Sequence, residues 1–114
     1  MPANFIALDS AERLAELIKN SHNHAVVLFK HSTTCGISAG VRHDVARIDG
    51  DIHIVVMQTQ RPLAMEIAQL TGIRHESPQA IVLRDGSPVY YASHYDIEPE
   101  KLQSFLNGAE ALAN

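Results

Sequence analysis

The feature that most constrains the fold is an apolar run that leads, through a short polar stretch, to the chain's only cysteine. Residues Ala25 to Phe29 are apolar and mostly β-branched or aromatic, which is the pattern of a strand buried on both faces. Residues 30–34 are polar. After them, an amphipathic helix is indicated by apolar residues that recur at spacings of four, four and three, namely Ile37, Val41, Val45 and Ile48. Cys35 is therefore expected at a strand-to-helix turn.

This position favours a reactive cysteine. The unpaired N–H groups in the first turn of a helix carry partial positive charge, which stabilises a thiolate relative to a thiol. The thiolate is the nucleophilic form of cysteine. The alternative is a buried and inert cysteine, since free cysteine is among the most buried residue types. The polar stretch before Cys35 favours exposure instead.

Length and cysteine content indicate one domain, residues 1–114, in a reducing compartment. A chain of 114 residues can bury about 65% of its unfolded surface and needs no disulfide. One cysteine cannot form an intramolecular disulfide. Met1 to Asp9 contains no basic segment followed by an apolar run, and no apolar run approaches the ~20 residues that span a bilayer. We therefore expect a cytoplasmic protein with no membrane partner.

Charge and histidine content exclude other classes. Nine Lys and Arg are scattered among thirteen Asp and Glu, whereas nucleic-acid binding requires a basic patch. Seven histidines could indicate metal or a pH-sensitive surface. However, His22-x-His24 lies in a polar turn, and one cysteine with scattered histidines makes no recognised zinc spacing. We expect neither nucleic-acid binding nor a metal site.

The first half of the remaining chain predicts two helices and a second buried strand. A helix should begin near Asp9 or Ser10, with Asp9 and Glu12 as a capping box, and its apolar face comprises Ala11, Leu14, Leu17 and Ile18. The apolar run 52–57 predicts a strand. Pro62 fits the first position of a helix that Gly72 ends, with Leu63, Ile67 and Leu70 at helical spacing.

The second half predicts a hairpin and a last helix. Strands 80–83 and 89–92 flank Asp85-Gly86, a strong signal for a two-residue hairpin turn. Pro88 has no N–H, so it should begin the last strand or lie at a sheet edge. Glu98 and Pro99 should open a helix whose apolar face comprises Leu102, Phe105, Leu106 and Ala109.

This order of elements matches a thioredoxin-like α/β fold. It implies a four-stranded mixed sheet, built from βαβ plus ββα, flanked by helices and preceded by an extra N-terminal helix. In that fold a reactive cysteine opens the helix after the first core strand, and a cis-proline precedes the third strand. Cys35 and Pro78 occupy these places. We therefore predict a cis Ser77-Pro78 bond, although few X-Pro bonds are cis.

The chain also resembles the monothiol bacilliredoxin family, thioredoxin-like redox proteins of the bacillithiol system, from about residue 9 to residue 106. The matching segments are Phe29-Lys30-His31-Ser32-Thr33-Thr34-Cys35, Ile37-Ser38, Arg61-Pro62, Thr71-Gly72, His75-Glu76-Ser77-Pro78-Gln79-Ala80 and Ala92-Ser93-His94. The resemblance implies removal of bacillithiol, a low-molecular-weight thiol, from mixed disulfides on proteins. Ser38 stands where a dithiol relative would carry a second cysteine. The chain departs from the family pattern at Gly36, where the pattern has proline, and this bears on the rigidity of the turn.

The resemblance implies Cys35 as the nucleophile and no bound cofactor. The partners would be S-thiolated proteins, bacillithiol or another low-molecular-weight thiol as co-substrate, and a disulfide reductase or second thiol for regeneration. Glutathione and coenzyme A are the other candidate thiols.

Neighbouring residues receive supporting roles. Thr33 and Thr34 could cap the helix or hydrogen-bond the thiolate, and Gly36 shapes the turn. Ser38 could hydrogen-bond the sulfur or only satisfy a backbone group in the first turn of the helix. Lys30, His31 and His75 could favour the thiolate by positive charge or contact carboxylates of an anionic thiol. Ser77 and Pro78 would pair through their backbone with an extended disulfide-bearing peptide. His94 receives no role.

Two other functions remain open. Cys35-Gly36-Ile37-Ser38 differs by one residue from the Cys-Gly-Phe-Ser signature of monothiol glutaredoxins, which hold a [2Fe-2S] cluster between two subunits. The chain lacks the Gly-Gly segment of those proteins after the hairpin and has Ala92-Ser93-His94-Tyr95 there. The second alternative is a redox-inactive thioredoxin-like adaptor, since a fold does not determine a function.

Overall fold

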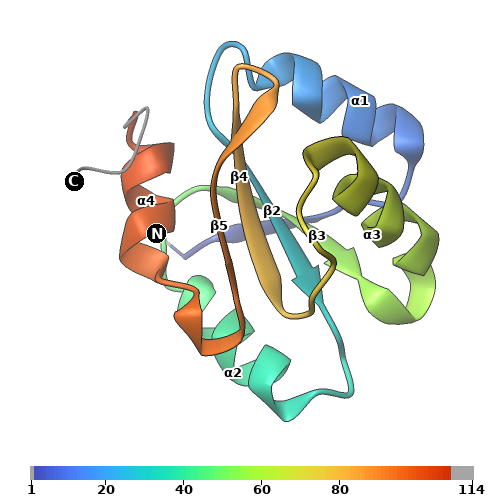
Figure 1. Ribbon diagram of the computed structural model, residues 1–114. Helices are drawn as coiled ribbons and strands as arrows, with labels where there is room; N and C mark the ends of the chain where they lie inside the picture. Colours follow the sequence, from blue (N-terminus) through green and yellow to red (C-terminus); the bar gives the residue numbers. More distant parts are fainter. Residues whose placement is uncertain (1, 109–114) are drawn as a thin grey trace.

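A five-stranded sheet in the order β1-β3-β2-β4-β5 lies at the centre of the computed structural model (Figure 1), which describes residues 2–108. The parallel strands β1, β3 and β2 form one half of the sheet, and the antiparallel hairpin β4-β5 extends it from β2. The strands are β1 (Asn4–Ala7), β2 (Val26–His31), β3 (Asp51–Val56), β4 (Gln79–Arg84) and β5 (Ser87–Ser93).

Helices cover both faces of the sheet (Figure 1). They are α1 (Ala11–Asn20), α2 (Gly36–Val45), α3 (Met57–Thr71) and α4 (Pro99–Leu106), with a short 3₁₀ turn η1 (His94–Asp96) before the last. Leu14 of α1 and Leu63 of α3 pack in one core cluster, whereas Val41 of α2 and Leu102 of α4 pack in another. The sheet therefore separates two hydrophobic cores, as expected for a thioredoxin-like α/β fold.

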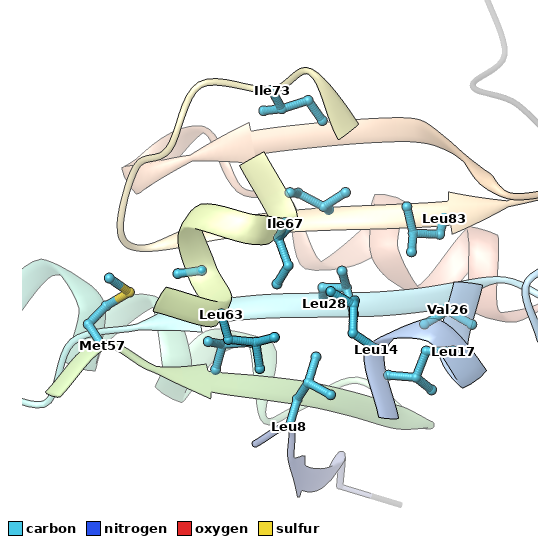
Figure 2. Packing of buried hydrophobic residues seen from close by; sticks show 13 residues of the cluster. Leu8, Leu14, Leu17, Val26, Leu28, Met57, Leu63, Ile67, Ile73 and Leu83 are labelled. Atoms are coloured by element: carbon cyan, nitrogen blue, oxygen red, sulfur yellow. The ribbon is translucent and has the colours of Figure 1, made fainter. Parts of the chain in front are cut away.

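Strand β2 contributes to both cores, and all six of its residues are buried. Leu28 faces α1 and α3, where Figure 2 shows it among Leu14, Leu63 and Ile67. Phe29 faces α2 and α4. Burial on both faces explains why the sequence of β2 is continuously apolar instead of alternating, and it confirms the prediction of a doubly buried strand.

Two predictions about the N-terminus are wrong. The sheet has five strands instead of four, because β1 pairs with β3 at the edge of the sheet. Helix α1 is not an extra N-terminal helix, since it connects β1 to β2. Strand β1 has four residues, none of them buried, so its sequence carries neither a long apolar run nor a clear alternation.

Helix α1 begins one residue later than the predicted capping box. Ser10 is the N-cap and its Oγ accepts a hydrogen bond from the N–H of Arg13 at 3.1 Å. Leu14 and Leu17 are buried as predicted, but Ala11 is exposed.

Helix α3 ends at Gly72 as predicted, but it begins at Met57, before the predicted start at Pro62, and contains a kink. Gln60 has non-helical backbone angles (φ −130°, ψ 35°), so the regular helix begins after it, where Pro62 loses no hydrogen bond. Gly72 ends the helix in the left-handed conformation at φ 74°. Leu70 was predicted on the apolar face, but it is 59% exposed.

The hairpin and the cis-proline are also confirmed. Asp85 and Gly86 both have positive φ (56° and 80°), as the favoured two-residue hairpin turn requires. Strand β5, which contains Pro88, lies at the sheet edge. The Ser77-Pro78 bond is cis. In α4, Leu102 and Phe105 are buried, while Ala109 lies outside the described residues.

The central position of β2 can be tested by a matched pair of substitutions. Leu28→Ala should lower the free energy of unfolding by about 2–5 kcal/mol, because Leu28 is 1% exposed and its removal leaves a cavity. Leu70→Ala removes the same atoms from a residue that is 59% exposed and should change stability by no more than about 0.5 kcal/mol. Urea denaturation measures both, and equal losses would contradict the assigned core.

Candidate active site

Cys35 lies directly before α2 as its N-cap residue, with extended backbone angles (φ −101°, ψ 121°). Its carbonyl accepts the first helical hydrogen bond, from the N–H of Ala39 at 3.0 Å. The residue is partly exposed, so the alternative of a fully buried cysteine is wrong. The structure confirms the predicted strand-to-helix turn.

Three segments that are distant in sequence meet at the end of the sheet where the central strand β2 reaches its last residue. This end of the sheet, defined by the paired residues His31, Val56, Lys30 and Gln79, is called the site edge. His31, the last residue of β2, pairs with Val56, the last residue of β3. Lys30 pairs with Gln79, the first residue of β4. The loop that carries Cys35, the start of α3 and the loop that ends at Pro78 therefore lie at the site edge, because each begins or ends at these paired residues.

Gln58, in the first turn of α3, holds the loop before Cys35. Its Oε1 accepts a hydrogen bond from the N–H of Thr33 at 3.0 Å. Its Nε2 donates to Ser32 Oγ at 3.0 Å and to Thr34 Oγ1 at 3.3 Å. Thr33 and Thr34 thus bind Gln58, and within residues 2–108 neither caps α2 nor hydrogen-bonds the sulfur. Sequence reasoning missed Gln58, because only the pairing of β2 with β3 brings it to the loop.

Ser38 links α2 to the end of β2 through its side-chain oxygen. It is fully buried, and its Oγ accepts a hydrogen bond from the N–H of Ser32 at 3.0 Å. The same oxygen lies 2.7 Å from His31 Nδ1. The sequence left two roles open for Ser38, a contact with the sulfur or with a backbone group in the first turn of the helix, whereas the backbone partner observed is Ser32, in the loop before Cys35. Ser38 therefore fixes the loop before Cys35.

His31 belongs to β2 and lies in the protein interior, 7% exposed and stacked on Phe29 with ring centroids 6.0 Å apart. Burial lowers the pKa of His31, and the positive charge of Arg42 lowers it further. His31 is therefore neutral near pH 7. Its burial and its contact with Ser38 favour a positioning role over the predicted contact with substrate.

Lys30 is also part of β2, although the sequence placed it in a polar loop. It is fully buried, and its Nζ lies 3.1 Å from His75 Nδ1. Burial lowers the pKa of Lys30 to about 8. The pKa of His75 is lowered, first by burial and then by the charges of Lys30 and Arg61, and Glu76 opposes this. Near neutral pH, a charged lysine therefore faces a neutral histidine.

The loop that ends at Pro78 is held from both sides. The carbonyl of Pro78 accepts a hydrogen bond from the N–H of His94 at 2.9 Å, which gives His94 a structural contact that the sequence did not suggest. Gln79 Nε2 donates to the carbonyl of Arg74 at 2.9 Å across the loop. Ser77 Oγ is buried and has no hydrogen-bond partner among the described residues. Ser77 and Pro78 thus remain candidates for the substrate side of the site.

Gly36 is the first residue of α2, and a side chain there would meet no atom within 4 Å. The structure therefore has room for a side chain at position 36, and steric crowding does not explain why this chain has glycine where the family pattern has proline.

In residues 2–108, no three His, Cys, Asp or Glu side chains are grouped so that they could hold a metal ion. None of the helices in that range combines the length and apolar character needed to cross a membrane.

Solved structures with the same fold include one described as a candidate oxidoreductase with a thioredoxin fold. It is 33% identical, covers 88% of this chain and 91% of its own, and has a TM-score of 0.79. A thioredoxin from Trypanosoma brucei brucei is 14% identical, with coverage of 91% and 88% and a TM-score of 0.70. A thioredoxin from Schistosoma mansoni is 17% identical, with coverage of 91% and 94% and a TM-score of 0.68. At these identities the two thioredoxins show the fold alone.

A family model also matches most of the chain. The model described as Monothiol bacilliredoxin BrxC matches residues 6–102, a range that includes Cys35, Gln58 and Pro78. This range covers most of the chain and agrees with the resemblance seen in its sequence. The chain belongs to the monothiol bacilliredoxin family of thioredoxin-like oxidoreductases.

Proposed function

We propose that the protein is a monothiol thiol-disulfide oxidoreductase that removes a low-molecular-weight thiol, bacillithiol, from protein mixed disulfides. The observation that carries this proposal is a single, partly exposed cysteine directly before α2, with Ser38 in the place of a second thiol. Membership of the monothiol bacilliredoxin family supports it.

The reaction requires one nucleophilic sulfur. The thiolate of Cys35 attacks the sulfur that the small thiol contributes to the mixed disulfide. A disulfide forms between Cys35 and the small thiol, the original disulfide breaks, and the substrate protein leaves as a thiolate that takes a proton from water. The chain has one cysteine, so a second thiol molecule or a disulfide reductase must release the small thiol from Cys35.

The contacts around Cys35 suit this chemistry. Gln58 and Ser38 hold the loop before Cys35 from two sides, so that little reordering is needed when a disulfide arrives. Ser77 and Pro78 lie at the site edge, and we assign them the wall against which the disulfide-bearing segment lies. A cysteine that must stay reduced between turnovers implies a reducing cytoplasm.

Replacement of the nucleophile tests the proposal directly. Incubation with oxidised bacillithiol should add one small thiol to the wild-type protein and none to Cys35→Ser, whose fold should be unchanged because Cys35 is not in the core. Intact-mass measurement detects the adduct, and circular dichroism checks the fold. Exchange activity retained by Cys35→Ser would refute the mechanism. A coloured, dimeric product after anaerobic addition of iron and sulfide would favour the cluster carrier instead.

The role of Gln58 predicts a loss of rate with a modest loss of stability. Gln58→Ala should slow exchange by about tenfold or more, because it frees the loop that positions Cys35. Gln58 is exposed but makes three hydrogen bonds to this loop, so the unfolding free energy should fall by about 1 kcal/mol. Gln69→Ala, at an exposed position further along α3, is the matched control and should affect neither. An unchanged rate for Gln58→Ala would remove Gln58 from the site.

The departure at Gly36 predicts a stabilising substitution. Gly36→Pro should raise the unfolding free energy by about 0.4–1 kcal/mol, because proline fits the first helical position and restricts the unfolded chain. Gly40→Pro changes the same residue type inside α2 and should cost about 3 kcal/mol or more, since it breaks a helical hydrogen bond. Urea denaturation measures the unfolding free energy of both variants. A loss of stability in Gly36→Pro as large as that in Gly40→Pro would contradict the assigned start of α2.

A further inference from the structure

Lys30 carries a buried charge that the protein does not balance. The side chain is fully buried, and none of the ion pairs among residues 2–108 includes it. Buried charges in proteins are normally paired with an opposite charge or a bound ligand. The side chain that Lys30 contacts is His75, at 3.1 Å, and this histidine carries no negative charge. The charge of Glu76 acts on His75, but among residues 2–108 Glu76 forms no ion pair with Lys30 or Arg61, so the region has the capacity to take up an anion from outside.

The contact with Lys30 determines which nitrogen of His75 can face a ligand. An ammonium group only donates hydrogen bonds, so His75 Nδ1 must accept. In a neutral imidazole the other nitrogen, Nε2, then carries the hydrogen. His75 is only partly buried, unlike Lys30. It therefore offers an Nε2–H donor to a ligand, and the buried ammonium group of Lys30, which contacts Nδ1 of the same ring, polarises this donor.

Arg61 adds a second cation to the same region. It lies near the start of α3 and is exposed, and within residues 2–108 it belongs to no ion pair. The charges of both Arg61 and Lys30 act on His75 and disfavour its protonation, against the opposite effect of Glu76. The surroundings of His75 are therefore net positive, which favours an anion that accepts hydrogen bonds.

We propose that His75 and Arg61, with Lys30 behind His75, form a subsite for a carboxylate of the low-molecular-weight thiol. The inference rests on the proposed function and names the recognition element of its small-thiol substrate. The placement agrees with it, because Lys30 pairs with Gln79 next to Pro78 and lies five residues before Cys35 in the chain. His75 and Arg61 contact the carboxylate, and Lys30 is a positioning residue that acts through His75.

The test compares two mixed disulfides of one model protein that differ only in carboxylates. One carries glutathione and the other carries glutathione diethyl ester, in which both carboxylates are masked. The wild-type protein should react with the free-acid form at about tenfold higher kcat/KM, chiefly through a lower KM, which corresponds to about 1.4 kcal/mol. Arg61→Gln, His75→Phe and Lys30→Met should each reduce this preference towards equality. Arg47→Gln is the matched control. It removes an exposed arginine beyond the end of α2 and should leave the preference for the free-acid form unchanged.

Each outcome decides a separate question. Equal reaction of wild-type protein with both forms would overturn the subsite and leave the proposed function in place. Failure of both forms, and of bacillithiol mixed disulfides, would overturn the proposed function itself. A second pair of model proteins, with either Glu or Gln beside the modified cysteine, tests whether the carboxylate belongs to the small thiol or to the substrate protein. If the wild-type protein prefers the model protein with Glu and Arg61→Gln removes that preference, the assignment to the small thiol is wrong. Arg61 is exposed, so this variant decides the matter even if Lys30→Met does not fold.

Discussion

The burial of β2 on both faces is the constraint on which the rest of the structure depends. Because β2 lies between two hydrophobic cores, its residues set the position of every neighbouring strand and helix. Its carboxyl end brings together the loop before Cys35, the start of α3 and the loop that ends at Pro78. The candidate site is thus a consequence of strand pairing, and its loops are held by the most buried strand of the molecule.

Polar residues at this end of β2 link the core to the site. Lys30 points to the side of α1 and α3, since it lies two residues after Leu28, and His31 lies on the opposite side with Phe29. Each has a specific partner, His75 for Lys30 and Ser38 for His31. Burial of polar groups without partners is costly, so these contacts favour one arrangement of the loops.

Much of the fold could be predicted from the sequence, because its signals are local. The apolar run of β2, the Asp85-Gly86 turn and the Gly72 helix end each specify their own backbone. Strand β1 could not be predicted in this way, since its place depends on pairing with β3, far along the chain. The same reason explains the site. The position of Cys35 was local and was predicted, whereas Gln58 and the burial of Lys30 depend on how distant strands pair.

The central claim is that Cys35 accepts a small thiol at the site edge, between the loop before it and the loop that ends at Pro78. A crystal structure of the protein with bacillithiol linked to Cys35 tests this claim most directly. We expect a disulfide at Cys35, with the small thiol lying against residues 75–78 and near Arg61. A small thiol that lies instead over α4, or extends into solvent without contacts to these residues, would contradict the account.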